Sequence, residues 1–199
     1  APNEKVTITD GNISAADLDS IANATNGAVT ATISSATNVA ETLAAITNVN
    51  PDDIITYTTT QATVDASDLV DLKEKVDIFN TGSVTKITEA STTENLGTVI
   101  TNALVIKPNV AVEITGDISA ADLNTLASYA TIGNITATIT AGAVAATLGA
   151  IGKVDANDTI TFTTNDTTVN ATNLVDLDAK VDTFNTGSVT KITEVAASV

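Results

Sequence analysis

The chain has 199 residues, carries a formal net charge of −16 and contains no Cys, His, Met or Trp. This charge opposes binding to nucleic acid or to anionic membranes, and the absence of Cys and His excludes zinc–thiolate sites and nucleophile–imidazole catalysis. Only 3% of the residues are aromatic while 43% are hydrophobic, so we expect a core of Val, Ile, Leu and Ala.

Eight short strands are predicted from stretches in which β-branched apolar residues alternate with Thr. They begin at Val6, Val29, Ile55, Val84, Val110, Ile135, Ile160 and Val189, with steps of 23 to 29 residues between successive starts. The stretch at 84–88 is irregular, because Val84 and Ile87 are three residues apart and cannot share one face of a strand. A β-bulge, or burial of both faces, would accommodate the pair.

Helices are predicted between the strands, because apolar residues recur there at spacings of three and four. Side chains suited to the N-cap precede them, namely Ser14, Asn38, Ser67 and Thr92 or Thr93. Two of the apolar stripes extend to Phe79 and Phe184, and we expect these helices to end there. Gly82 and Gly187 then suit left-handed helix ends.

The sequence repeats itself with an offset of 105 residues. The stretch FNTGSVTKITE at 79–89 recurs letter for letter at 184–194, and ISAADL at 13–18 recurs at 118–123. Such self-similarity predicts a tandem duplication. We expect a first repeat of four strand–helix units at 1–109 and a second at 110–199, with the last unit truncated.

A strand and a helix in every 25 residues or so leave room for right-handed crossovers between parallel strands. We therefore predict one continuous right-handed α/β solenoid of the leucine-rich-repeat kind, with about eight short strands on one wall and helices on the other. The exposed face would be threonine, for example Thr30, Thr32, Thr136 and Thr138. The alternative is a doubly wound parallel sheet or two compact α/β domains. Strands of a doubly wound sheet are covered on both faces and so have continuous apolar runs, whereas the strands predicted here alternate with Thr.

The first and last predicted strands would leave sheet edges that can pair with another chain. Val6, Ile8, Val189 and Ile192 are the candidate interface residues for a homo-oligomer or filament joined end to end by strand pairing. An excerpt from a longer repeat array is the alternative reading. A chain that begins at Ala1 without Met suits signal-peptidase cleavage and export, although removal of the initiator Met alone would give the same start. No apolar run approaches the length of a bilayer span, so membrane insertion is not expected.

No catalytic residue and no cofactor site is predicted, because the acidic residues fall in loops and on expected helix surfaces. Calcium is the best candidate ligand, through the hard oxygen donors of Asp10, Asp52, Asp53, Asp117, Asp155 and Asp158. These residues also suit turns for purely local reasons. The Thr-x-Thr rows resemble the ice-binding face of antifreeze solenoids, and Thr equally suits any solvated strand.

The stretch ISAADLNTLASYATIGNITATIT at 118–140 resembles repeats in giant acidic, Thr/Ala/Asp-rich cell-surface or secreted proteins of cyanobacteria and other aquatic bacteria. This resemblance implies an extracellular, structural or adhesive role without catalytic residues. We expect a non-enzymatic, self-assembling structural protein, or part of a cell-surface array. The alternatives are a calcium- or glycan-binding adhesion module and, more weakly, an ice-binding surface.

Overall fold

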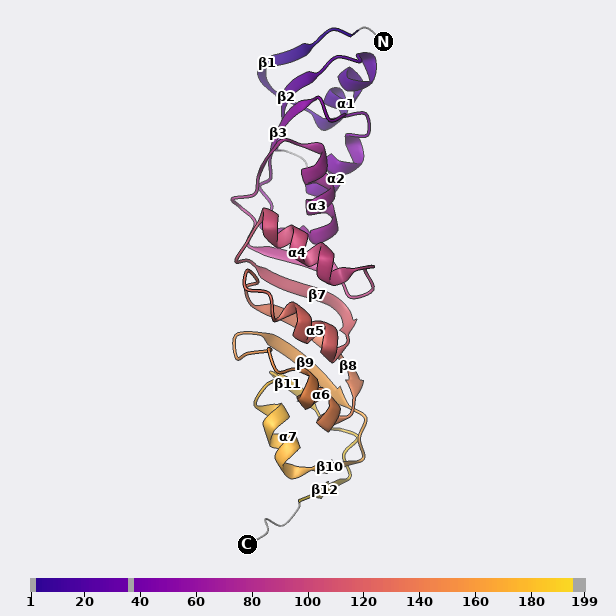
Figure 1. Cartoon of the computed structure of the whole chain (residues 1–199), viewed down its shortest axis with the longest axis vertical. Coiled ribbons are helices and arrows are strands. Elements are labelled where there is room, and N and C mark those ends of the chain that lie inside the picture. Colours follow the sequence, from indigo (N-terminus) through magenta and orange to yellow (C-terminus); the bar gives the residue numbers. More distant parts are fainter. Residues whose placement is uncertain (1–2, 36–37, 195–199) are drawn as a thin grey trace. The chain divides into compact units, whose positions relative to one another are not determined.

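The computed structural model describes residues 3–35 and 38–194, and it is a mixed α/β protein with parallel strands (Figure 1). Its helices are α1 (Ala15–Ala24), α2 (Val39–Ala45), α3 (Ala66–Lys75), α4 (Leu96–Ile106), α5 (Ala120–Leu126), α6 (Val144–Ala150) and α7 (Ala171–Asp178). Its strands are β1 (Val6–Ile13), β2 (Val29–Ile33), β3 (Ile54–Thr58), β4 (Thr63–Asp65), β5 (Ile78–Asn80), β6 (Lys86–Ala90), β7 (Ala111–Ile118), β8 (Ile135–Gly142), β9 (Thr159–Thr164), β10 (Thr168–Asn170), β11 (Thr183–Asn185) and β12 (Lys191–Thr193).

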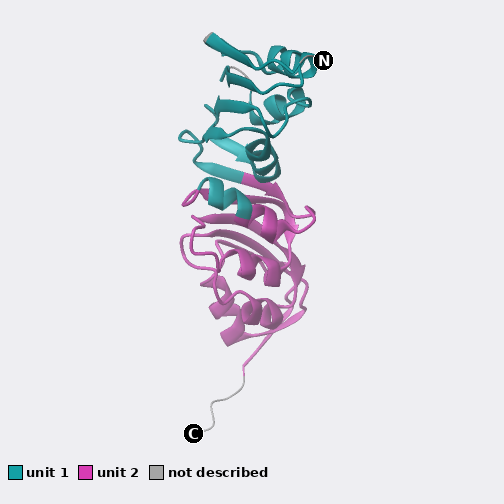
Figure 2. Ribbon diagram, turned by 45° about the horizontal axis from the view of Figure 1, so that its top comes forward, with its two compact units in different colours: residues 1–87, 102–107 teal, residues 88–101, 108–199 magenta. Residues whose placement is uncertain are grey.

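The chain divides into two compact units (Figure 2). Unit 1 consists of residues 1–87 and 102–107, and unit 2 consists of residues 88–101 and 108–199. The division passes through β6 and α4, whereas the sequence repeat divides after residue 109.

In unit 1 four strands pair in parallel in the order β1-β2-β3-β5. Figure 1 shows α1, α2 and α3 along one side of the first three of these strands. Burial in β2 alternates strictly, with Val29, Ala31 and Ile33 buried. The side chains between them, Thr30 and Thr32, are half-exposed. The prediction that Thr forms a second, solvated strand face is confirmed in this unit.

Unit 2 repeats this arrangement with the order β7-β8-β9-β11, again parallel, and β10 pairs in parallel with β12. Two aromatic residues in each unit occupy equivalent register positions. Tyr57 of β3 pairs with Phe79 of β5, and Phe162 of β9 pairs with Phe184 of β11. In both pairs the ring centroids lie 5.6 Å apart, a separation favourable for aromatic packing.

Five of the described helices, α1, α2, α3, α5 and α7, begin after a residue whose side chain caps the first turn. Ser14 accepts a hydrogen bond from the Asp17 N–H at 3.1 Å, and Asn38 forms a reciprocal capping box with Glu41. Both N-caps were predicted. The cap of α3 is instead Asp65, whose carboxylate accepts from two backbone N–H groups of the first turn, so the prediction of Ser67 is wrong by two residues.

The repeated FNTGS segment is a strand followed by a turn, and the prediction that it ends a helix is wrong. Helix α3 stops at Lys75, and Phe79 lies in β5, where it packs against Tyr57. The spacing of Phe79 fits a helical stripe, but a residue of a short strand can point inward at the same position. Pairing with β3 favours the strand here. Among the described glycines only Gly11 and Gly116 have positive φ, so Gly82 and Gly187 are not left-handed helix ends.

The irregular pair Val84 and Ile87 needs neither a bulge nor a strand buried on both faces. Val84 lies before β6, in a turn closed by its N–H donating to the Thr81 carbonyl at 3.0 Å. Ile87 lies within β6, and both side chains are buried. The strand therefore begins two residues later than predicted.

Candidate functional site

Two of the predicted calcium ligands form part of the internal hydrogen bonding of the fold. Asp53 is 3% exposed, and its carboxylate accepts from the Val29 N–H at 2.7 Å and the Asn50 N–H at 2.9 Å. Asp158 is 9% exposed and accepts in the same way from the N–H groups of Ile135 and Asp155, at 2.8 and 3.1 Å. Each carboxylate thus satisfies the first N–H of a neighbouring strand.

Two aspartates that sequence reasoning missed bond to a neighbouring strand in a similar way, at the second residue of that strand. Asp77 accepts from the Ile55 N–H at 2.9 Å, and Asp182 accepts from the Ile160 N–H at 2.8 Å. In both cases the backbone N–H of the aspartate donates to the carbonyl of the same isoleucine, at 3.0 and 2.9 Å. The available signal was an Asp placed just before a strand in both sequence copies. We call these four residues (Asp53, Asp77, Asp158 and Asp182) the strand-start aspartates.

The described side chains among the remaining calcium candidates do not bond to a neighbouring strand. Asp52, Asp117 and Asp155 are exposed, and the side chain of Asp10 lies outside the described residues. Asp155 accepts from the Asn157 N–H at 2.8 Å, as an Asx turn requires. Among the described side chains, no group of three or more acidic residues is placed to hold a metal ion.

The two glycines next to these acidic residues have a backbone role. Gly11 has φ of 106° and Gly116 has φ of 83°, and each lies in a register shift of its strand. In β1 the shift falls between Thr7 and Asn12, and in β7 it falls between Glu113 and Asp117. The acidic loops that suggested calcium therefore contain a β-bulge in both units.

Three of the four predicted interface residues lie on terminal strands of the described sheets. Val6 and Ile8 are half-buried on β1, which pairs with β2 and is the first strand in its sheet order. Ile192 is 59% exposed on β12 and lies opposite Val169 of β10. Val189 is half-buried and precedes β12, its N–H donating to the Thr186 carbonyl. The structure thus places Val6, Ile8 and Ile192 on strands and Val189 in a turn.

The exposed strand faces form rows of side chains at paired register positions. In unit 2 one row consists of Asp117, Thr138, Thr161 and Thr183. The equivalent row of unit 1 consists of Asn12, Thr32, Thr56 and Ile78. At the next position the Asn80 side chain donates to the Thr58 hydroxyl at 3.0 Å, and Asn185 does the same to Thr163 at 3.1 Å. The rows present hydroxyl, amide and methyl groups to solvent.

One carboxylate has a perturbed ionisation. Asp19 of α1 accepts from the backbone and side-chain N–H groups of Asn48, at 2.6 and 2.7 Å, and from the Thr47 hydroxyl. Desolvation raises the pKa of Asp19, but the hydrogen bonds from Asn48 and Thr47 together outweigh it, so the pKa lies below its usual value. In unit 2 the same position is Asn124, which accepts from the Lys153 N–H at 2.7 Å. The position therefore needs an acceptor and does not need a charge.

Comparison with protein-family models, with curated proteins and with solved structures finds no match to this chain. No helix in the ranges 3–35 and 38–194 combines the length and the apolar character that a bilayer span needs. The function must therefore be argued from the geometry described above.

Proposed function

We propose that this chain is a non-enzymatic structural protein of the cell surface or extracellular space, in which parallel strand pairing joins copies head to tail. In this proposal the two units are duplicated stretches of one right-handed α/β solenoid. The strand edges are the assembly elements, and the exposed Thr rows are the surface presented to the surroundings.

The observation that carries the proposal is that both units join neighbouring strands with the same side-chain bonds. The strand-start aspartates connect residues 22 to 24 positions apart in both units, and the aromatic pairs occur at the same register. A fold whose contacts are mainly between successive repeats can be extended by adding another repeat. A second copy of the chain can supply that repeat.

The edge of β1 supports this mode of assembly. Val6 donates its N–H to the Ala28 carbonyl of unit 1, so the N–H of the next residue, Thr7, points to the opposite edge of the strand. An N–H with that orientation can donate a hydrogen bond to a carbonyl of a further parallel strand. On the side-chain level, Ile8 and Ile192 offer apolar groups for the contact.

The test compares two substitutions of Thr7 in the full chain. Thr7→Pro removes the outward N–H while leaving the Val6 bond to β2 intact, and proline is tolerated on edge strands for this reason. Thr7→Val keeps the N–H and is the matched control. Light scattering and negative-stain microscopy over a range of protein concentrations measure the assembly.

We expect the unmodified chain and Thr7→Val to form concentration-dependent linear oligomers, and Thr7→Pro to remain monomeric with an unchanged circular dichroism spectrum. Monomers of the unmodified chain at every concentration would refute self-assembly. Oligomers of Thr7→Pro as long as those of the control would refute pairing through β1.

A further inference from the structure

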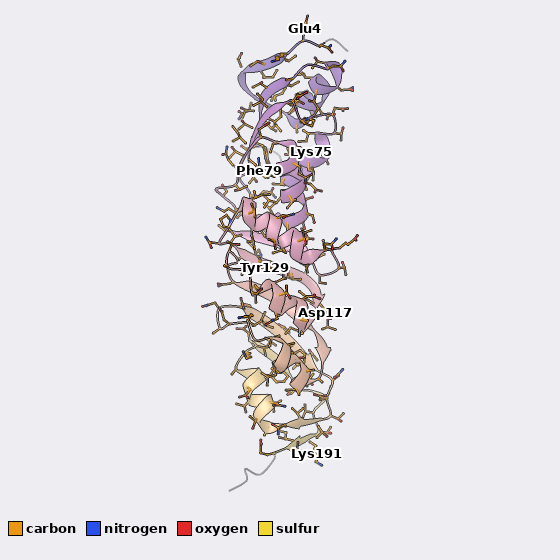
Figure 3. The ribbon with its side chains drawn as sticks, in the orientation of Figure 1. Glu4, Lys75, Phe79, Asp117, Tyr129 and Lys191 are labelled. Atoms are coloured by element: carbon orange, nitrogen blue, oxygen red, sulfur yellow. The ribbon has the colours of Figure 1, made fainter. Side chains whose placement is uncertain are left out.

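Unit 2 contains a cavity of about 390 Å³ at the first turn of α4 and the end of α5. Asn95, Leu96 and Gly97 line it from the α4 side, and Asp122, Leu126 and Tyr129 line it from the α5 side. Its volume lies at the small end of the range of about 300–1,000 Å³ that is typical of ligand pockets. Tyr129 is labelled in Figure 3.

The polar groups around this cavity have free hydrogen-bonding capacity. Within the described part of the chain, neither the Tyr129 hydroxyl nor the Asn95 side-chain amide makes a hydrogen bond. Asp122 accepts from the Ser119 hydroxyl at 2.6 Å through Oδ2, which leaves Oδ1 available as an acceptor. A donor–acceptor hydroxyl, an amide and a carboxylate therefore surround one small space.

The backbone makes room for the tyrosine. A Cβ on Gly97 would lie 3.0 Å from the Tyr129 hydroxyl, so glycine at this position permits the close approach of the phenol to α4. The loop that carries the tyrosine also departs from the repeat. Residue 24, at the position of Tyr129 in the first copy, is Ala, and the stretch SYATIG at 128–133 is one residue longer than NATNG at 23–27.

The chemistry of the lining selects the ligand class. Asp122 is the one charged side chain among the described lining residues, and together with the net charge of −16 it disfavours anions. A single carboxylate is too few oxygen donors for a divalent cation. An apolar ligand would leave the Asn95 amide and the Asp122 carboxylate without hydrogen-bond partners. A neutral sugar ring satisfies all of these groups, because its hydroxyls pair with the amide and carboxylate and its C–H face packs on the ring of Tyr129.

The geometry points to a binding site for one neutral pyranose in this cavity, with Tyr129 as the stacking residue and Asp122 and Asn95 as partners of its hydroxyl groups. This site is independent of the strand-edge assembly proposed above, because its lining residues come from α4, α5 and their flanking loops.

The experiment uses the full chain and four probes, the methyl pyranosides of glucose, galactose, mannose and N-acetylglucosamine. Saturation-transfer NMR detects binding, and titration calorimetry measures the dissociation constant up to roughly 20 mM, the range of weak single-ring contacts. We expect saturable binding of at least one probe. Tyr129→Ala should weaken it about tenfold or more, the loss of one good contact.

Two further variants separate binding from folding. Gly97→Ala places a methyl group against the tyrosine hydroxyl and should weaken binding several-fold, although alanine favours a helix over glycine and should not destabilise the unit. Asp122→Asn should also weaken binding. Its matched control is Asp17→Asn, because Asp17 has the same N-cap geometry, with the Ser14 hydroxyl 2.7 Å from its Oδ2, but lies in unit 1.

Binding that is lost in Gly97→Ala and Asp122→Asn but kept in Asp17→Asn establishes the site. The absence of saturable binding for all four probes would overturn it. So would binding that Tyr129→Ala leaves unchanged, or binding that Asp17→Asn reduces as much as Asp122→Asn does.

Discussion

At equivalent register positions on the exposed strand face, unit 1 and unit 2 carry different side chains. Unit 1 has Ile54 and Ile78, which are 52% and 51% exposed, where unit 2 has Thr159 and Thr183. At the other end of one row, Asn12 of unit 1 corresponds to Asp117 of unit 2. In this row the face of unit 1 is therefore neutral and partly apolar, and the face of unit 2 has mainly hydroxyl groups and one carboxylate.

Inside, the two units use the same contacts. The strand-start aspartates, the aromatic pairs and the glycine bulges occur in both, at closely similar distances. Stacking of neighbouring strands restricts which side chains the interior can hold, because every inward side chain meets the equivalent residue of the next strand. The solvent face has no such restriction, so differences in binding between the units should arise there and in loops such as the one that carries Tyr129.

The largest expected effect comes from removing the central aromatic side chain of each unit. Tyr57 and Phe162 are fully buried, so Tyr57→Ala and Phe162→Ala should each lower the free energy of unfolding by about 4 kcal/mol. Urea denaturation followed by circular dichroism measures the loss, with the exposed neighbour Thr58→Ala as control. A loss in one unit less than half that in the other would contradict their equivalence.

Next in size is the loss of a strand-start aspartate. Asp53→Ala leaves the N–H groups of Val29 and Asn50 without an acceptor, and Asp158→Ala does the same in unit 2, so each should cost about 3 kcal/mol. The control Asp52→Ala removes an exposed carboxylate and should change stability by less than about 0.5 kcal/mol. Hydrogen exchange should localise the effect to the substituted unit.

The aspartates are predicted here to act without a metal. Adding calcium at millimolar concentration, of the order of weak extracellular sites, should therefore leave the stability cost of Asp53→Ala unchanged. A calcium-dependent difference between Asp53→Ala and the unmodified chain would contradict this role and favour the original calcium assignment.

A smaller effect concerns the charge at residue 19. Because the pKa of Asp19 is lowered in the folded state, its ionised form stabilises unit 1 at pH values above 3.8, the ordinary pKa of this side chain. This contribution is lost as the pH falls through the lower folded pKa. Asp19→Asn should be slightly less stable than the unmodified chain at about pH 7, and the difference should shrink as the pH is lowered. Urea midpoints at neutral and at acidic pH measure this difference.

The reciprocal variant Asn124→Asp should gain the same pH dependence in unit 2, since Asn124 occupies the equivalent position and accepts from the Lys153 N–H. If Asn124→Asp shows no acid-dependent change, the two positions are not equivalent.

The smallest expected effect on stability is the exchange of exposed side chains between the units. Ile54→Thr with Ile78→Thr gives unit 1 the hydroxyl face of unit 2 and should change the unfolding free energy by no more than about 0.5 kcal/mol per site. Retention on a hydrophobic-interaction column should fall, because two exposed apolar groups are removed. Unchanged retention would show that these isoleucines are not available on the surface.

The sequence predicted the parallel α/β class, the solvated Thr face, the first two N-caps and the approximate positions of eight of the strands. Alternation of apolar residues with Thr, and N-cap chemistry, are local properties, so a single chain segment contains the information. The three-residue strands β5 and β11 were missed, because Phe79 and Phe184 also fit the preceding helical stripes. The cavity beside Tyr129 was missed because its two sides are separated along the chain by more than twenty residues.

By itself, then, the sequence determined most of the helices, the longer strands and the solvated strand face, because periodicity and capping act within a few residues. Only the tertiary structure decided what Asp53 and Asp158 do. Their partners lie on the previous strand, 24 and 23 residues away along the chain. Whether such a carboxylate is an exposed charge or a buried hydrogen-bond acceptor depends on where that strand lies. Parallel pairing over such distances decides the role of the residue.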